Sequence, residues 1–470
     1  MRIGTSSTRA IVTTIARHPI ATVFLSALGI RVLVASVTNL LSSGVVIPDE
    51  RQYLTLAMMA STGKLTDDFW FGYGQSLFDA SRTFLWPLTA IFWLVGPSRF
   101  AAQLLPIMFG AATAATTVVI ADQFLRRPYA LLAGFIVAFF PSQVLWSSVV
   151  LRESQVWIAL AGMAVVLVHS HGPVSVGRII NSTLLVGVIF FCLSYLRQQT
   201  ALLAIWSAIP ALLLGQGNRG IRAISAVCLL LVAPWLAGLG PGGATLGGES
   251  IVRIGTTHAY MSMTASSSFV AGGDSSSVVA GGDSSSVVAG VDSFQRMSSE
   301  ECTTRVSLKD STTGPLPINK RETSMYSCII DYQGRAILAD NRLFSSISRI
   351  PRGIINTMIR PFPWEARRDF FVSTAALESG LWWALYTLSG IGLYSNRQNL
   401  RKIIFPLLII GLLVLSGAVT HGNLGTAFRH RGQGLFIFAV FAAGGIQAIV
   451  DKYDCWRQCR GVISLTPTST

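Results

Sequence analysis

Charged residues are scarce in this sequence. Only 12% of its 470 residues are Asp, Glu, Lys or Arg, while 51% are hydrophobic and the mean hydropathy is +0.55. A typical soluble domain carries about 25% charged residues, so the composition excludes an ordinary soluble enzyme. Apolar runs of membrane length recur along the chain. The sequence therefore predicts an all-α polytopic membrane protein.

Cysteine is equally scarce, with six in the whole chain, too few for a disulfide framework at this length. Cys455 and Cys459 follow the last apolar run and have no further metal ligand nearby, so they form no zinc motif. Cys302 and Cys328 share one long polar loop. If that loop is exported, these two thiols are able to pair, although nothing in the sequence requires it.

The familiar motifs of nucleotide and hydrolytic chemistry are also missing. No P-loop, zinc motif, nucleophile elbow or dinucleotide fingerprint occurs. The net charge of +14 does not indicate nucleic acid, because the basic residues stand mostly at the ends of apolar runs, where the positive-inside rule places them. Membrane lipids, including anionic ones, are the expected contacts, and nucleic acid is not an expected partner.

The hydropathy pattern predicts about ten transmembrane helices plus one half-helix. Residues 84–96 would reach only about 20 Å as a helix, so we expect the half-helix there. With this count the basic residues at 126–127, 178, 219–222, 397–402 and in the tail fall inside, which puts both termini in the cytoplasm of a plasma-membrane protein. The predicted spans cover residues 19–41, 101–121, 129–148, 155–170, 180–196, 200–215, 223–240, 371–393, 403–420 and 434–450.

The same pattern divides the chain into four parts. A transmembrane module covers residues 1–240 and includes an acidic first outer loop at 42–83; an exported loop follows at 241–370, C-terminal helices at 371–450 and a cytoplasmic tail at 451–470. The exported loop holds a nine-residue repeat, SSSFVAGGD and two variants, over residues 266–292. It lacks the GGxGxD calcium pattern, so we interpret it as low-complexity sequence. Further on, TSMYSCIIDYQGRAIL predicts two strands joined by a turn.

The stretch IPDERQYLTLAMMA at residues 47–60 combines acidic and apolar residues. Tyr53, Leu54, Ala57 and Met58 recur at helical spacing, which predicts an amphipathic helix on the membrane surface. Its first turn carries Asp49 and Glu50. Carboxylates at the mouth of a membrane cavity are candidates for function. The alternative is an N-cap aspartate followed by a first-turn glutamate, with no chemical role.

Under the predicted topology several polar residues converge on the outer face. Arg197 and the basic cluster at 429–431 lie there against the positive-inside rule, so an anionic ligand such as a lipid phosphate is expected to explain them. The alternatives are a snorkelling interfacial Arg197 and a simple surface pair between Arg152 and Glu153. The full set is Asp49, Glu50, Arg152, Glu153, Arg197, Arg429, His430 and Arg431.

Three short motifs, PDERQY, LLPIMFG and FPSQVLWSSVVLRES, together with the order of spans, resemble the GT-C superfamily of membrane glycosyltransferases. The resemblance is strongest to the glycosyltransferase family 39 type, which uses a polyprenyl-phosphate sugar. It implies Asp49 as the catalytic base, Glu50 as its neighbour and Glu153 as a second acid. The second acid stands here as Glu in LRES, where Asp is common in the family, and the repeats match no family pattern.

The predicted function is transfer of a hexose or pentose from a polyprenyl-phosphate donor to a glycan, lipid or protein acceptor on the outer face, with inversion. Arg197, Arg429 and Arg431, with Arg152 and His430 beside them, are expected to hold the lipid phosphate. A divalent metal on the two acids is compatible with the sequence but not required. The alternatives are a cell-surface polysaccharide polymerase or ligase, and a transporter or flippase, for which the internal repeat is missing.

Overall fold

The computed structural model describes residues 18–41, 48–65, 78–169, 175–214, 218–236, 326–330, 336–340, 350–365, 370–420 and 424–463. The nonapeptide repeat at 266–292 and Cys302 lie outside these ranges. The helices are α2 (Pro19–Leu41), α3 (Pro48–Ser61), α5 (Arg82–Val95), α6 (Arg99–Ala121), α7 (Arg127–Phe139), α8 (Pro141–Ser147), α9 (Glu153–His169), α10 (Val176–Ser194), α11 (Gln198–Leu213), α12 (Arg219–Leu236), α17 (Ile350–Met358), α18 (Phe370–Ser395), α19 (Ile404–Thr420), α20 (Leu424–Arg431) and α21 (Leu435–Ile463).

A two-stranded hairpin and three short 3-10 helices complete the described elements. Strands β1 (Tyr326–Ile330) and β2 (Ala336–Asp340) pair antiparallel, with Tyr326 opposite Asp340, so the two predicted strands are confirmed, and the predicted turn at 331–335 lies outside the described residues. The 3-10 helices are η3 (Pro363–Glu365), η4 (Arg397–Ile403) and η5 (Gly432–Gly434).

Fewer helices qualify as membrane spans than the sequence predicted. In the described residues four helical stretches are long and apolar enough to cross a membrane, namely α2, α6, α10 and Phe428–Gln458, and the bent pair α7 and α8 makes five. The prediction of about ten spans is not supported. Several predicted spans form helices that are too short to cross a membrane: α9 has 17 residues and α11 has 16. At 1.5 Å per residue these reach about 25 Å, less than the hydrocarbon core of about 30 Å.

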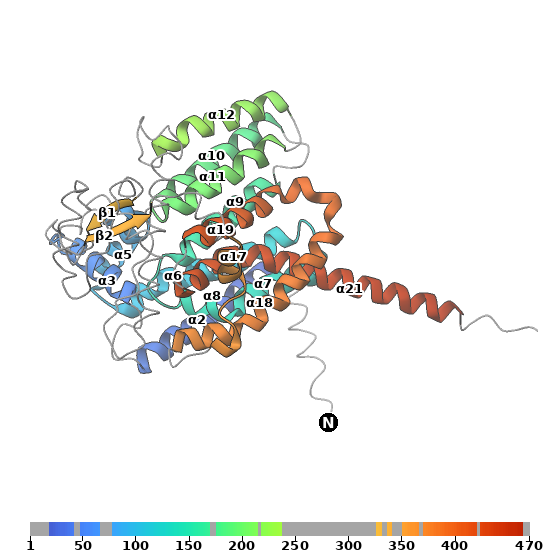
Figure 1. Ribbon diagram of the computed structural model, residues 1–470, viewed down its shortest axis with the longest axis horizontal. Helices are drawn as coiled ribbons and strands as arrows, with labels where there is room; N and C mark the ends of the chain where they lie inside the picture. Colours follow the sequence, from blue (N-terminus) through green and yellow to red (C-terminus); the bar gives the residue numbers. More distant parts are fainter. Residues whose placement is uncertain are drawn as a thin grey trace, which may run out of the picture.

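The helices pack against one another in groups, with α6 from the first half of the chain near the centre. In Figure 1, α10, α11 and α12 run side by side as one layer, and the C-terminal α21 projects well beyond the other helices. Helix α6 lies centrally and contacts α2, α7 and α9, and α18 packs along α21. The apolar helices support membrane association, whereas the plasma-membrane location and the orientation of the termini stay predictions.

Helices α7 and α8 form a bent pair that is long and apolar enough to cross a membrane only when the two are taken together. They meet at an angle of 55° across Phe140, whose backbone is extended at φ −63° and ψ 123°. Pro141 follows and opens α8. A proline disfavours the helical conformation of the residue before it and lacks the N–H that would continue the ladder. The sequence FFPSQ therefore ends α7 and redirects the chain toward the segment that carries Glu153.

Helix α3 confirms the helix predicted at residues 47–60, and its buried stripe includes Leu56 in place of the predicted Leu54 and Met58. Tyr53, Leu56 and Ala57 are buried, whereas Met58 is 41% exposed. The buried stripe faces α5, where the rings of Tyr53 and Phe84 meet edge to face at 5.2 Å. Helix α5, the predicted half-helix, has only 14 residues and is not among the candidate spans. The pair α3 and α5 thus places Asp49 and Glu50 against the bundle.

Candidate functional site

Two carboxylates from distant helices meet at one guanidinium. Asp49 lies in the first turn of α3, Glu153 opens α9, and Arg429 lies in the last turn of α20. Arg429 donates from Nη1 to Asp49 Oδ2 at 2.7 Å and from Nε to Glu153 Oε1 at 2.6 Å. The Glu153 side chain is fully buried, and those of Asp49 and Arg429 are 9% and 11% exposed. The charges are therefore paired in a largely water-free place.

Arg197 brings a second guanidinium to the same glutamate. It stands at the N-cap of α11 and donates from Nη2 to Glu153 Oε1 at 3.1 Å, with only 3% of its side chain exposed. Two acids and two arginines thus form one connected ion network of Asp49, Arg429, Glu153 and Arg197. These four residues were predicted to converge, and the structure brings them together.

Glu50 points to a different partner. It accepts both guanidinium donors of Arg99, at 3.0 Å from Nε and 3.1 Å from Nη2, and its Oε1 lies 3.3 Å from the backbone N–H of Val150. Glu50 is fully buried. The contact joins the start of α3 to the start of α6 and to the segment before α9. Glu50 therefore fixes the position of its neighbour Asp49.

Arg152 also forms hydrogen bonds to residues outside the ion network. Its Nη1 donates to Ser81 Oγ at 2.9 Å and to the carbonyl of Leu196 at 2.7 Å, and its guanidinium lies 5.9 Å from the centre of the Tyr53 ring. Ser81 is the N-cap residue of α5, and Leu196 lies between α10 and α11. The side chain thus ties α5 to the end of α10, directly beside Glu153.

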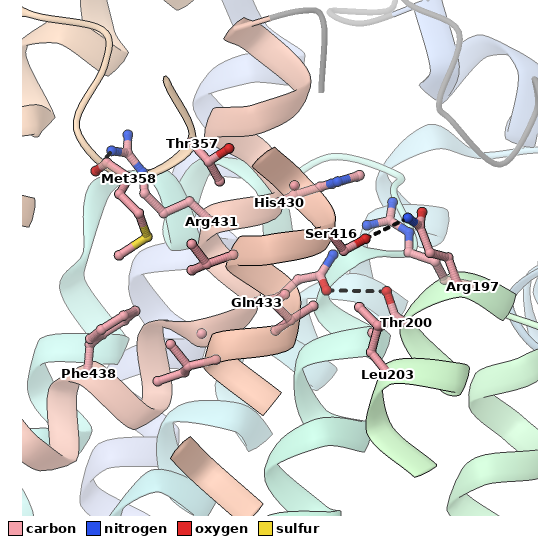
Figure 2. Close-up of a pocket in the computed structure, with 16 residues that line it drawn as sticks. Arg197, Thr200, Leu203, Thr357, Met358, Ser416, His430, Arg431, Gln433 and Phe438 are labelled. Carbon is pink, nitrogen blue, oxygen red and sulfur yellow. Dashed lines mark hydrogen bonds between the residues drawn. The ribbon is translucent and has the colours of Figure 1, made fainter. Parts of the chain in front are cut away.

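A cavity of about 550 Å³, counting its open mouth, adjoins the ion network through Arg197. Helices α11, α17, α19 and α21 form its walls with the end of α20. In Figure 2 the guanidinium groups of Arg197 and Arg431 lie on opposite sides of the view, and the His430 ring lies between them, nearer Arg197. The apolar lining consists of Leu203, Met358, Ile410, Leu413, Val414 and Phe438. The cavity is therefore lined by both cationic and apolar side chains.

Arg431 is the buried cation of this cavity. It is 5% exposed, donates from Nη1 to the carbonyl of Met358 at 2.7 Å, and lies 4.9 Å from the ring centres of both Trp382 and Phe428. Its guanidinium also interacts with the Tyr386 hydroxyl and the Glu378 carboxylate, both on α18. Arg431 thus lines the cavity and at the same time joins α20 to α17 and α18.

Polar residues inside apolar runs complete the surroundings of the site. Glu378 of α18 is buried and accepts hydrogen bonds from the backbone and hydroxyl of Ser142 and from the indole of Trp382, each at 2.7 Å. The sequence analysis did not select Glu378, although a glutamate within the apolar run 371–393 is itself a signal. Arg99 was not predicted either, because it stands at the end of an apolar run, where a basic residue does not indicate a functional site.

In the part of the chain that the structure describes, no three or more His, Cys, Asp or Glu side chains gather as metal ligands. Asp49 and Glu153 both face the guanidinium of Arg429, so a metal ion bound by these two carboxylates would have to displace an arginine. In this structure the guanidinium of Arg429 occupies the place between the two carboxylates that a divalent ion would need.

Neither a protein-family model nor a curated protein matches the sequence. Among solved structures, the chain is similar to the archaeal oligosaccharyltransferase AglB from Archaeoglobus fulgidus in complex with an inhibitory peptide and a dolichol-phosphate, with a TM-score of 0.52 and 10% identity. The match covers 97% of this chain and 53% of that protein, so the chain spans about half its length. At this identity the likeness shows a shared fold and nothing finer. The predicted resemblance to family 39 stays a prediction.

Proposed function

We propose that the chain is a membrane glycosyltransferase that moves a sugar from a polyprenyl-phosphate donor to an acceptor hydroxyl. The observation that carries the proposal is the junction of two features at Arg197. This arginine binds Glu153 of the ion network at 3.1 Å and also lines the cavity. A group bound at Arg197 therefore lies close to Glu153, which Arg429 joins to Asp49.

The lining of the cavity contains both kinds of side chain that a polyprenyl phosphate needs, because that lipid carries an anionic head on an apolar chain. Arg197, His430 and Arg431 line the cavity together with apolar residues such as Leu413 and Phe438. Guanidinium groups bind phosphate oxygens through paired, charge-assisted hydrogen bonds. The dolichol-phosphate named with AglB is a lipid of the same class, which adds support from a protein of similar fold.

The chemistry uses one displacement. Asp49 takes the proton of the acceptor hydroxyl while that oxygen forms a bond to the anomeric carbon. The bond from the anomeric carbon to the phosphate oxygen breaks, and the phosphate leaves with the electron pair, its charge stabilised by the arginines. Because a phosphate is already a good leaving group, no general acid is needed. One direct displacement gives inversion at the anomeric carbon.

The contacts suggest different roles for the predicted site residues. Asp49 acts as the base. Glu153 accepts hydrogen bonds from both Arg429 and Arg197, so its role is to orient these two cations. Glu50 and Arg152, whose partners are Arg99 and the Leu196 carbonyl, position the site instead of touching substrate.

The test is donor turnover by protein reconstituted in lipid nanodiscs. Radiolabelled polyprenyl-phosphate hexoses and pentoses are supplied one at a time, with acceptor extracted from the source membranes, and release of free polyprenyl phosphate is followed. The proposal predicts release with at least one donor by the native chain and none by Asp49→Asn. Release that is equal in both, or absent with every donor, would overturn it.

A further inference from the structure

Arg31 is a charged residue fully buried inside the apolar helix α2. Its guanidinium makes four hydrogen bonds: from Nε to Ser147 Oγ at 2.7 Å, from Nη1 to the carbonyls of Ala27 at 3.0 Å and Ala138 at 2.9 Å, and from Nη2 to the carbonyl of Val137 at 3.4 Å. A cation in such a place is costly unless its donors are satisfied. These bonds satisfy them.

Two of the acceptors exist because the pair α7 and α8 is bent. Val137 and Ala138 lie in the last turn of α7, whose final carbonyls lose their helical partners where the chain turns at Phe140. In an apolar surrounding each carbonyl without a partner is unfavourable. Arg31 therefore caps the end of α7, and its bond to Ser147 ties down the far end of α8.

Helix α8 in turn contacts the surroundings of the site at three places. Gln143 donates to the carbonyl of Gly432, the residue after Arg431, at 2.8 Å. Ser142 bonds to Glu378. Beyond the end of α8, the backbone N–H of Val150 lies 3.3 Å from Glu50. The placement of α8 thus sets where Glu153 and the segment with Arg429 meet.

A second observation shows that the fit around Arg31 is close. A methyl group at Gly110 of α6 would lie 2.8 Å from Arg31 Nε and 2.7 Å from Ser147 Cβ. Real side chains do not approach this closely, so a residue larger than glycine would push Arg31 and Ser147 apart. Glycine at position 110 of α6 leaves the space that the hydrogen bond between Arg31 and Ser147 needs.

We infer that Arg31 is a positioning residue for the transfer reaction: by capping α7 and holding α8 it sets the approach of Glu153 to Arg429. The inference rests on the proposed function, because the reaction whose rate it affects is sugar transfer. Arg31 itself touches none of the four residues of the ion network in the hydrogen bonds that it makes.

The test compares Arg31→Met and the milder Ser147→Ala with a matched control, Arg222→Met. Arg222 is also a buried arginine and donates to the carbonyl of Leu212 at 3.0 Å at the end of α11, away from α8. Each full-length variant in nanodiscs is measured for donor turnover and for amide hydrogen exchange. Arg31→Met is expected to lower kcat about 100-fold with the donor KM within about threefold, because misplacement by about 1 Å has that effect.

Amide exchange decides the role of Arg31 even if no donor is turned over. Exchange in residues 141–153 is expected to rise more than about tenfold in Arg31→Met, less in Ser147→Ala, and to stay unchanged in Arg222→Met, where the rise falls at the end of α11. Unchanged exchange in 141–153 in Arg31→Met would overturn the inference. So would equal loss of turnover in Arg31→Met and Arg222→Met, since that points to general destabilisation. Failure of the native chain to turn over any donor contradicts the proposed function instead.

Discussion

Asp49 and Glu153 share one cation although they lie on different helices: Arg429 is 2.7 Å from Asp49 and 2.6 Å from Glu153. The Glu153 side chain is fully buried, and that of Asp49 is 9% exposed. The arrangement brings α3, α9 and α20 together at one point, so any change in one of these helices alters the geometry of the other two. This dependence leads to predictions for both activity and stability.

Replacing Asp49 with Asn keeps the size of the side chain but removes its ability to take a proton. We expect sugar transfer to fall by about 10²–10⁴-fold, the usual contribution of a general base. The measurement is kcat in nanodiscs. Asp79→Asn is the matched control, because Asp79 is an exposed acid near the start of α5, and its activity should equal that of the native chain. Equal losses in both variants would contradict the role of Asp49.

The pair Glu50 and Arg99 should behave as a structural unit. Glu50→Gln removes the buried carboxylate and leaves the Arg99 guanidinium without its charged partner, so the free energy of unfolding should fall by about 3 kcal/mol, near the low end for buried pairs because Arg99 is 16% exposed. The double variant Glu50→Gln with Arg99→Met should lose less than the sum of the single variants. Unfolding by titrated SDS in mixed micelles measures both values, and additive losses would show that the two residues are uncoupled.

Filling the cavity should weaken donor binding. Leu413 of α19 lines the cavity, whereas Leu415 on the same helix is 44% exposed. Leu413→Trp is expected to raise the donor KM more than about tenfold with little change in kcat, because it removes space for the lipid before the reaction begins. Leu415→Trp should leave both constants unchanged. If both tryptophans act alike, the lipid binds elsewhere.

Close packing between α18 and α21 gives a prediction on stability. A methyl group at Gly392 would collide with the backbone of Phe441, whereas one at Gly390 would meet nothing within 4 Å. Gly392→Ala should lower the free energy of unfolding by about 1–3 kcal/mol through overpacking. Gly390→Ala should leave it unchanged or raise it by up to about 1 kcal/mol, since alanine favours helix. The same SDS titration compares them, and equal effects would argue against this contact.

The sequence predicted much of this arrangement because the signals were local. Hydropathy located most helices to within a few residues, for example α2 at Pro19–Leu41. Asp49 was selected because a carboxylate at a membrane cavity is costly, and Arg197 and Arg429 because the predicted topology placed them on the outer face against the positive-inside rule. The resemblance to a known family added Glu153 as a second acid. The number of spans was overestimated because an apolar run reports burial as well as membrane contact, and helices such as α11 are apolar on account of packing inside the bundle.

The roles of individual arginines could not be predicted in the same way. Arg152 and Arg431 both follow apolar runs, but Arg152 bonds to Ser81 and Leu196, whereas Arg431 lines the cavity. Which carbonyls a guanidinium reaches depends on tertiary contacts between distant helices, and no sequence spacing encodes them. Arg31 could have been selected from the sequence, because it is an arginine inside the first apolar run. Its hydrogen-bond partners on α7 and α8 are known only from the folded chain.

The most direct measurement of the central claim is the binding of two lipids that differ only in the head group. A short polyprenyl phosphate and the matching polyprenol are titrated into nanodiscs that hold the native chain or Arg431→Met. Because the guanidinium of Arg431 lines the cavity, the native chain is predicted to bind the phosphate at least about tenfold more tightly, and Arg431→Met to lose most of this preference. Equal binding of both lipids by the native chain would contradict a lipid-phosphate site in this cavity.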